Sequence, residues 1–466
     1  MSVDAEPRAA PAPTPEVPTL GQATRVWAKI GVLGFGGPAG QIALMHKELV
    51  ERRRWLDEER FLHALNYCML LPGPEATQLA TYIGWLMHKT RGGLVAGVLF
   101  VLPGFVAILG LSLLYAGLHA VPAVSALFYG LKAAVLAVVV EAALRIGRRA
   151  LKTRLMLLVA ALAFVAIFAF AVPFPALVAT AGVVGLVVGR LRPELFPRPP
   201  VIAAVGSHDT VVDVLAARGD LAHTRPSAAR AVRVVVVCGL LWAAPLAVLL
   251  LLHGPDGVLV QEGLFFSKTA VVTFGGAYAV LAYIAQRAVQ GYHWLGPGQM
   301  LDGLGLAETT PGPLIMVVQF VGFLGAAANP PAGVDPMVAG VLGSLVTVWV
   351  TFVPCFLWIF LGAPYIEALR GNRALWTALS TITAAVVGVI LDLSLWFALH
   401  VLFKGVATVD AGPIHVIVPD LASLDPAALV LCVAALAAML WLKLGMGKTL
   451  AAAALLGAAW KLGPGA

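Results

Sequence analysis

The sequence contains little charge for its length. Of its 466 residues only 12% are charged, whereas 60% are hydrophobic and the mean hydropathy is +0.91. A soluble domain carries about 25% charged residues, so a surface that faces water all round is excluded. Apolar stretches of about 18 or more residues recur, and each is long enough to cross roughly 30 Å of hydrocarbon. We therefore expect an all-α polytopic membrane protein.

The sequence also has few residues with which to build a metal centre or a catalytic site. Its four cysteines lie apart in apolar segments, and its ten histidines show no metal-ligand spacing. We find no constellation of nucleophile and base, so we expect neither an enzyme, nor a cofactor, nor a metal. The net charge of +7 does not indicate a nucleic-acid partner, because the placement of Lys and Arg matters more than their sum in membrane proteins.

An internal duplication is the most informative feature that is present. A shift of 239 positions, with no gap, superimposes three motifs of the first half on three of the second. The matched pairs are Phe35-Gly36-Gly37 with Phe274-Gly275-Gly276, Trp55-Leu56 with Trp294-Leu295, and Pro72-Gly73-Pro74 with Pro311-Gly312-Pro313. Duplicated halves of this kind are typical of secondary transporters.

The distribution of basic residues predicts that the two halves are inverted relative to each other. The loop after the first FGG motif holds Lys47, Arg52, Arg53, Arg54 and Arg60, whereas the equivalent loop near 291–298 is preceded only by Arg287. Lys and Arg favour the cytoplasmic side, so the two loops should lie on opposite sides of the membrane.

We accordingly divide the chain into five regions. Residues 1–21 are rich in Pro, Ala and acidic groups and lack the pattern of a secretory signal, which predicts a disordered tail. The other regions are an N-terminal repeat (22–190), a basic cytoplasmic linker (191–233), a crossing span with an outer loop (234–261) and an inverted C-terminal repeat (262–466).

The glycine–proline motifs interrupt the apolar segments, and two topologies account for them. In the first, the FGG and PGP segments of both halves are re-entrant hairpins, near 22–45, 61–87, 264–286 and 299–327. In the second, each is a broken helix that spans the membrane. The hairpins place the basic residues better, and we prefer them. Either topology gives about ten to thirteen membrane segments.

Interrupted helices at membrane depth predict a binding site for an anion. Broken backbone is tolerated there only inside protein or beside a polar cavity, and the start of a new helix carries partial positive charge. The expected substrate-binding residues are Gly34, Phe35, Gly36, Gly37, Gln41, Pro72, Gly73, Pro74, Thr77, Gln78, Thr273, Phe274, Gly275, Gly276, Thr309, Thr310, Pro311, Gly312 and Pro313, with Lys132 as a candidate counter-charge. The alternative is that the glycines serve only close helix packing.

Two acidic residues lie inside the interrupted segments, at positions that are not equivalent in the two halves. Glu75 follows the first PGP motif and Glu308 precedes the second. A carboxylate within the membrane is costly and usually functional, so both are candidates for proton coupling. A simple pairing with a lysine is the alternative.

These motifs together resemble the chromate transporter family in its long, two-domain form. The residues that carry the resemblance are Phe35-Gly36-Gly37-Pro38 with Gln41 and Met45, Arg53-Arg54-Trp55, Leu71-Pro72-Gly73-Pro74 with Thr77-Gln78-Leu79 and Ile83-Gly84, and Leu102-Pro103-Gly104. The resemblance covers roughly 22–190 and 262–400. It implies a secondary transporter in the cell membrane that exports chromate and confers resistance, driven by the proton gradient or by anion exchange.

Other functions stay open on the residues alone. Sulfate has the charge and shape of chromate, so an importer or exchanger of sulfate or another oxyanion is the main alternative. An ion channel fits inverted halves with broken helices less well than alternating access does. The partners we expect are a small inorganic oxyanion and the lipid bilayer, and the sequence leaves a homodimer open.

Overall fold

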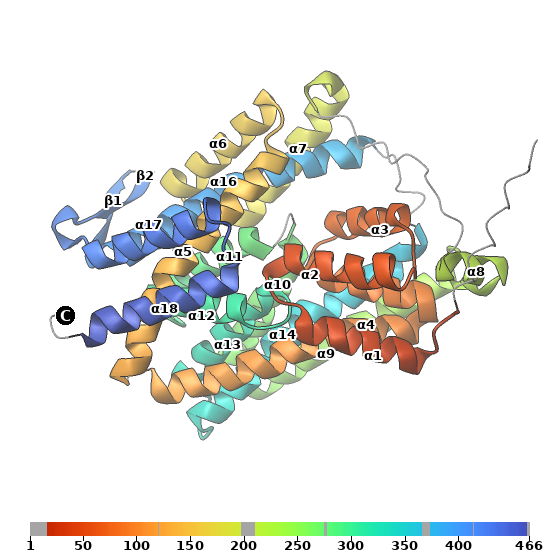
Figure 1. Ribbon diagram of the computed structural model, residues 1–466, viewed down its shortest axis with the longest axis horizontal. Helices are drawn as coiled ribbons and strands as arrows, with labels where there is room; N and C mark the ends of the chain where they lie inside the picture. Colours follow the sequence, from red (N-terminus) through yellow and green to blue (C-terminus); the bar gives the residue numbers. More distant parts are fainter. Residues whose placement is uncertain are drawn as a thin grey trace, which may run out of the picture.

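The computed structural model describes residues 16–119, 121–196, 210–274, 277–365, 373–412 and 414–463, and nearly all of this is apolar helix (Figure 1). In the described part of the chain, six helical segments are long and apolar enough to cross a membrane. They are Glu75–Leu118, Pro122–Ala150, Phe174–Leu191, Ala228–His253, Pro336–Tyr365 and Arg373–Leu402. With the shorter apolar helices they make an all-α polytopic membrane protein, as the composition predicts.

The first half comprises α1 to α7. Asp57 starts α3 by accepting a hydrogen bond from the amide of Arg60 at 2.7 Å, and Pro122 occupies the first position of α5, where a proline costs no hydrogen bond. The elements are α1 (Leu20–Leu33), α2 (Gly37–His46), a π-helix (Lys47–Arg52), α3 (Glu58–Leu70), α4 (Glu75–Leu118), α5 (Pro122–Ala150), α6 (Arg154–Phe170) and α7 (Phe174–Leu191).

The second half repeats this order after α8 (Val211–Ala217), which lies in the linker, and α9 (Ala228–His253), which supplies the crossing span. Its elements are α10 (Val258–Val272), α11 (Ala277–Gln286), a π-helix (Arg287–Gly291), α12 (Pro297–Thr309), a 3-10 turn (Leu314–Met316), α13 (Val317–Ala328), α14 (Pro336–Gly362), α16 (Arg373–Leu402), α17 (Pro426–Leu440) and α18 (Met446–Leu462).

The backbone confirms the duplication. A shift of 239 positions carries α3 onto α12 residue for residue. The same shift relates the hydrogen bond from the Trp55 amide to the Leu49 carbonyl (2.7 Å) to that from the Trp294 amide to the Ala288 carbonyl (2.8 Å). A π-helix precedes each tryptophan. The gapless match in sequence is therefore a match in local structure.

Both interrupted segments of the first half are re-entrant hairpins. The base of the first hairpin contacts the linker, because the Val211 amide donates to the Arg54 carbonyl at 3.0 Å. The base of the second hairpin also contacts the linker, because the Trp85 carbonyl lies 3.0 Å from His223 Nε2. His88, at the end of the second hairpin, contacts the Pro18 carbonyl just before the first (2.8 Å). All four ends therefore lie on one side of the molecule, which the broken spanning helices of the second topology would not allow.

Helix α4 supplies the return arm of the second hairpin and then crosses the molecule. The chain leaves helical geometry at His88 and Lys89 (φ +57° at Lys89), and the two parts of α4 then run side by side. Glycine has no Cβ atom, and a Cβ atom placed at Gly93 (its Cβ position) would lie only 3.1 Å from the Thr81 carbonyl oxygen. Small residues therefore allow this close approach. The second part ends near Leu118, far from the linker.

The hairpins of the second half open at the opposite end of the molecule. Tyr115, near the end of α4, donates to Asp302 of α12 at 2.8 Å, and Lys132 lies against Gly298 at the start of α12. Gln286 and Gln290, at the base of the first of these hairpins, line a pocket together with His415 and Ile417 of a short β-hairpin (residues 406–419). Figure 1 shows this β-hairpin and α8 at opposite ends of the long axis. The inverted arrangement that the basic residues predict is confirmed.

A small β-hairpin between α16 and α17 was not foreseen. Strands β1 (Val406–Ala411) and β2 (Ile414–Pro419) pair antiparallel, with Val406 opposite Pro419. Alternating β-branched residues and a glycine with φ of +65° at Gly412 explain it locally. Each strand has only six residues, so the hairpin contributes little to the hydropathy and composition on which the sequence prediction depends.

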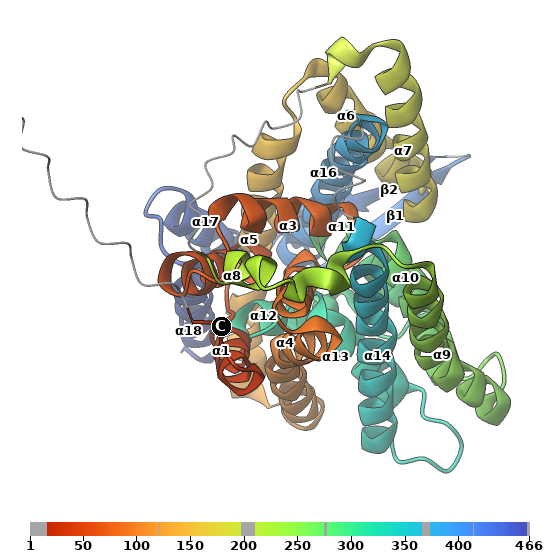
Figure 2. The same cartoon turned by 90° about the vertical axis from the view of Figure 1, so that its right-hand side faces the viewer.

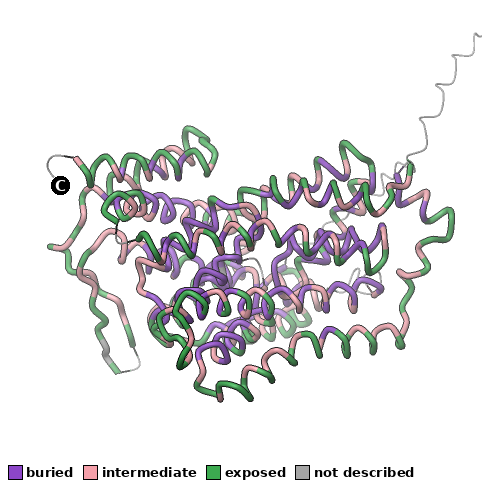
Figure 3. Tube along the Cα trace, turned by 90° about the horizontal axis from the view of Figure 1, so that it is seen from below, coloured by how far each residue is buried: buried purple, intermediate pink, exposed green. Residues whose placement is uncertain are grey.

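Burial separates the core from the lipid-facing surface. Figure 3 shows buried residues concentrated along the centre of the molecule, whereas the peripheral helices are largely exposed. Helix α9 is apolar, yet only 6% of an apolar stretch of 18 residues within it is buried. In Figure 2 it lies at the edge beside α14. An apolar helix with so little protein contact is suited to hydrocarbon rather than to water.

The boundaries of the five regions proposed from the sequence stay predictions. Residues 1–15 and 197–209 lie outside the described part of the chain, so most of the expected tail and part of the expected linker are not seen. Helix α9 begins at Ala228, six residues before the crossing span that the sequence suggests. The linker docks on the first half through Arg60 and Asp213, whose charged atoms lie 2.6 Å apart.

Candidate functional site

The tips of the four hairpins consist of the glycine–proline motifs. Helix α1 ends at Leu33 and α2 begins at Gly37, with φ of +88° at Gly36. Between α3 and α4, Gly73 has φ of +120°, and between α12 and the following 3-10 turn Gly312 has φ of +98°. Residues with a side chain rarely adopt such angles. Glycine is therefore required for the chain to reverse at each of these three points.

The tips of one half pair with the tips of the other. The amide of Gly312 donates to the carbonyl of Gly34 at 3.1 Å, and the amide of Gly73 donates to the carbonyl of Thr273 at 2.8 Å. The shift of 239 positions converts one bond into the other. Each FGG tip thus contacts the PGP tip of the opposite half, and the interrupted backbones meet inside the protein as the anion-site hypothesis requires.

Gln41 strengthens one of these two junctions. Its side chain is fully buried, and its Nε2 donates to the carbonyls of Gly34 (3.2 Å) and Gly312 (2.5 Å). A single amide from α2 therefore joins a tip of the first half to a tip of the second. The equivalent position in the second half is Val280, which cannot make such bonds.

Small residues of α4 allow the second PGP tip to approach. The Cβ position of Gly104 lies 2.7 Å from the Pro311 carbonyl and 3.2 Å from Gly312 Cα. A side chain at Gly104 would displace the tip, which gives the Leu102-Pro103-Gly104 motif a physical reason. On the other side of the site, Cys355 Sγ of α14 lies 3.2 Å from the Cβ position of Gly73.

Several of the expected substrate-binding side chains already have hydrogen-bond partners within the protein. Gln78 Nε2 donates to the Pro72 carbonyl at 2.7 Å, and the hydroxyls of Thr309 and Thr310 donate to carbonyls of α12. Thr77 Oγ1 is buried and has no hydrogen-bond partner among the described residues. These side chains shape and stabilise the tips. The free donors for an anion are therefore the Thr77 hydroxyl and the amides at the helix starts, which have no intrahelical partner.

The other expected site residues are placed as follows. Pro74 and Pro313 immediately precede α4 and the 3-10 turn, so each opens the returning arm of a hairpin. Phe35 is 48% exposed and does not line a closed site, whereas Phe274 is partly buried. Gly275 and Gly276 lie outside the described residues.

The two candidate acids differ in their surroundings. Glu75 is the first residue of α4, with 9% of its surface exposed. Glu308 is 4% exposed and lies at the tip end of α12, where its Oε1 accepts a hydrogen bond from the Tyr278 hydroxyl at 2.6 Å. Its Oε2 has no partner in the described part of the chain and faces Gly37, whose Cβ position is 3.9 Å away.

Lys132 is not gathered at the tips. Its Nζ lies 3.3 Å from Asp302 Oδ2, and Asp302 also accepts from Tyr115. Asp302 precedes Glu308 by six residues, about 9 Å along α12. The pair therefore lies between the tips and the open end of the second half.

Sequence reasoning passed over two buried acids in the second half. Asp302 is 3% exposed, and Glu262 of α10 is fully buried, with its carboxyl against Gly325 and Gly343. Both could have been found by the rule that singled out Glu75 and Glu308, because each is an acidic residue in an apolar membrane segment.

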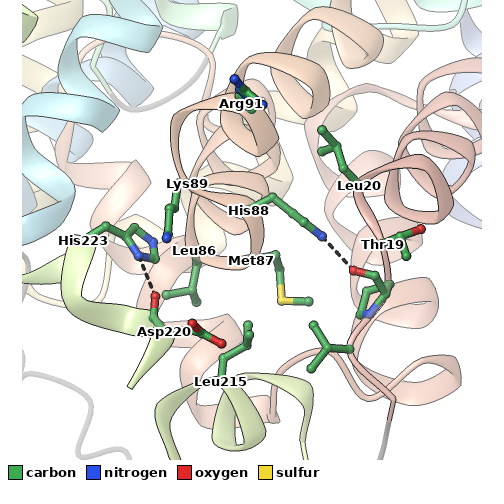
Figure 4. Close-up of a pocket in the computed structure, with 12 residues that line it drawn as sticks. Thr19, Leu20, Leu86, Met87, His88, Lys89, Arg91, Leu215, Asp220 and His223 are labelled. Carbon is green, nitrogen blue, oxygen red and sulfur yellow. Dashed lines mark hydrogen bonds between the residues drawn. The ribbon is translucent and has the colours of Figure 1, made fainter. Parts of the chain in front are cut away.

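A pocket of about 310 Å³ lies at the base of the first-half hairpins rather than at their tips. Figure 4 shows Lys89 beside His223 of the linker, with Asp220 below them, His88 on the side of Thr19 and Arg91 at the top. Partial burial of His223 holds its pKa below the ordinary value, so the ring is largely neutral at neutral pH. The pocket on the linker side is thus lined by two basic side chains, Lys89 and Arg91, and one acidic side chain, Asp220. In the described residues there is no cluster of ligands that could hold a metal ion.

Comparison with known proteins agrees with this architecture. Residues 21–186 and 260–458 match the family model described as Chromate transporter. A chromate transport protein of Pseudomonas aeruginosa is 34% identical over 370 residues, which cover 78% of this chain and 77% of that protein. One of Cupriavidus metallidurans is 28% identical over 380 residues, covering 80% of this chain and 81% of that protein.

A probable chromate transport protein of Synechococcus elongatus is 28% identical over 375 residues, covering 80% and 83% of the two chains. No solved structure matches. The two matched ranges are the two halves described above, joined by the linker and α9. This chain is a multi-pass protein of the cell membrane, and it belongs to the chromate transporter family.

Proposed function

We propose that this protein carries chromate across the cell membrane, and that it exports it and so confers resistance. The observation that carries the proposal is the pairing of the hairpin tips, Gly34 with Gly312 and Gly73 with Thr273. Because the pairs join oppositely oriented halves, movement of one half against the other would expose the junction to either side in turn. Family membership supplies the substrate class.

The proposed substrate site lies at the helix starts that follow the tips. Amides at the start of a helix attract a dianion without a formal charge, so the site needs no buried lysine. This suits the structure, because Lys132 is engaged with Asp302. The linker side is the proposed cytoplasmic side, since it carries Arg52, Arg53, Arg60, Lys89 and Arg91.

Export is tested in cells. Cells that express the chain should accumulate less chromate and tolerate more of it than cells that express a Gly312→Leu variant at the same level in the membrane. Increased accumulation would indicate import instead. Unchanged accumulation with both proteins inserted would contradict transport of chromate altogether.

The substrate and the driving force are tested with purified protein in liposomes. We expect chromate flux to depend on a pH gradient or on an exchangeable anion inside. Sulfate serves as the competitor, because it has the same charge and shape. A flux of sulfate that chromate does not inhibit would favour the alternative of a sulfate importer or exchanger.

A further inference from the structure

The carboxyl group of Glu308 stands where an anion would bind. Its Oε2 is buried without a hydrogen-bond partner in the described part of the chain, and it lies 3.9 Å from the Cβ position of Gly37. Gly37 is the first residue of α2, which is ten residues long and has Pro38 in its first turn. A side chain of the second half thus faces the start of a helix in the first half.

The start of α2 is well suited to hold a negative charge. The first amide groups of a helix have no intrahelical acceptor, and they carry the positive end of the helix dipole. Gly36, with φ of +88°, precedes the helix and has no side chain to cap it. An anion at this position would therefore satisfy groups that the protein itself leaves open.

Among the described residues, no cationic side chain is in contact with Glu308. Tyr278 of α11 binds its Oε1 at 2.6 Å. The nearby charged groups are Arg145 and Glu141 of α5, and these two pair with each other at 3.6 Å. Asp302, by comparison, has Lys132 at 3.3 Å. The negative charge of Glu308 is thus compensated either by the helix start or by a proton.

We propose that Glu308 is an internal anion that occupies the start of α2 in the substrate-free protein and leaves it on protonation, so that each bound oxyanion is accompanied by one proton. The inference rests on the proposed function and adds the coupling step: the oxyanion and its proton cross together with one net negative charge, so a membrane potential that is negative inside favours their export, whereas an inward proton gradient opposes it. A dianion beside an ionised Glu308 would bring three negative charges together. When the carboxylate takes up one proton from solution, one of these charges is removed. The oxyanion then accepts hydrogen bonds from the amides at the start of α2.

The test measures proton uptake when the anion binds. Purified protein in weakly buffered detergent solution, with a pH-indicator dye, is mixed with chromate at a pH where chromate is itself fully deprotonated. We expect the wild-type protein to take up close to one proton for each chromate bound. Glu308→Gln should still bind chromate but take up none, and its affinity should no longer fall as the pH rises.

Glu262→Gln is the matched control. Glu262 is another fully buried carboxyl of the second half, and it lies eleven residues from the tip at Thr273, about 16 Å along α10. We expect this variant to keep the proton uptake. Proton uptake that persists in Glu308→Gln, or that is lost in Glu262→Gln alone, would overturn the inference.

A second variant keeps the inference testable if Glu308→Gln does not fold. Tyr278→Phe retains the carboxyl but removes the hydroxyl that holds it, so proton uptake should remain while the pH of half-maximal binding shifts. An unchanged pH dependence would contradict the role given to Glu308. If the wild-type protein neither binds nor transports chromate, the proposed function fails. If it does both, and Glu308→Gln still takes up a proton, only the inference fails.

Discussion

The two halves of this protein share a backbone but differ in their chemistry. The bonds from Gly312 to Gly34 and from Gly73 to Thr273 are equivalent under the duplication. The side chains around them are not, since Gln41 corresponds to Val280 and Glu308 to Met69. Duplication therefore accounts for the symmetric junction of the tips. The bridging amide is present in one half only, and the buried acid in the other only.

Substitution of the tip glycines should give the largest difference between the two halves in chromate flux. Leucine at Gly312 or Gly73 would be strained by about 1–3 kcal/mol from its positive φ alone. A Cβ at Gly312 would also lie 2.9 Å from Gly104 Cα, which is backbone, whereas at Gly73 it would meet Gln78 Nε2 at 2.9 Å, a side chain that can move. We expect chromate flux into liposomes to fall by about 10- to 100-fold for Gly312→Leu and by less for Gly73→Leu.

Gly110→Leu is the control for these variants, because Gly110 lies exposed on α4 with nothing within 4 Å of its Cβ position. It should retain normal flux and normal insertion. If both tip variants behaved like this control, the motifs would serve packing alone. A larger loss at Gly73 than at Gly312 would reverse the ranking of the two junctions.

The ion pairs of the two halves give an intermediate effect. Lys132→Met would leave Asp302 buried with no cation, and breaking a buried pair costs up to about 3–5 kcal/mol, less here because Lys132 is 30% exposed. Lys29→Met is the matched variant in the first half, where Glu48 keeps Arg52 at 2.6 Å. We expect Lys132→Met to lower the melting temperature in detergent more than Lys29→Met does.

The double variant Lys132→Met with Asp302→Asn should recover part of the loss, because it removes the unpaired charge. Equal melting temperatures for the two single variants would show that Asp302 is stabilised by its other neighbours, such as Tyr115. The two halves would then not differ in their dependence on an ion pair.

The smallest effect is expected for the docking of the linker, which contacts the hairpin bases of the first half. Partial burial favours the neutral form of Asp213, but hydrogen bonds from Thr210 and Arg60 outweigh it and hold the pKa below the ordinary value. A lowered folded pKa adds stability that is present above the unfolded pKa and is lost as the pH falls through the folded value. We therefore expect α8 to detach from the hairpin bases in acid.

Limited proteolysis of the linker at decreasing pH measures this detachment. Wild-type protein should become more sensitive to cleavage as the pH falls below the usual range for an aspartate. Asp213→Asn should be sensitive already at neutral pH and should change little with acid. The same acid-dependent rise in cleavage in Asp213→Asn would show that another group is responsible.

The sequence predicted the architecture in some detail. Charge scarcity gave the membrane class, and the gapless match between Pro72-Gly73-Pro74 and Pro311-Gly312-Pro313 gave the duplication. The arginines of the first loop gave the inversion, and the hairpins preferred on charge are those seen. These predictions succeeded because they depend on patterns summed over many residues or on backbone angles that only glycine adopts.

The side-chain roles were predicted less well. Lys132 was expected as a counter-charge for the substrate, yet it pairs with Asp302 from another helix. Gln78 is predicted to bind the substrate, yet its side-chain amide donates to the Pro72 carbonyl of its own tip. A polar group in an apolar segment must find a partner, but the sequence does not say which of the groups brought near by folding will be that partner.

By itself, then, the sequence determined that this chain lies in the membrane as two inverted, interrupted repeats, because hydropathy, positive charge and glycine act locally along the chain. Only the tertiary structure decided that each FGG tip meets the PGP tip of the opposite half, and that Glu308 faces the start of α2. Those contacts join residues 200 or more positions apart. They arise from the packing of one half against the other, which no local pattern encodes.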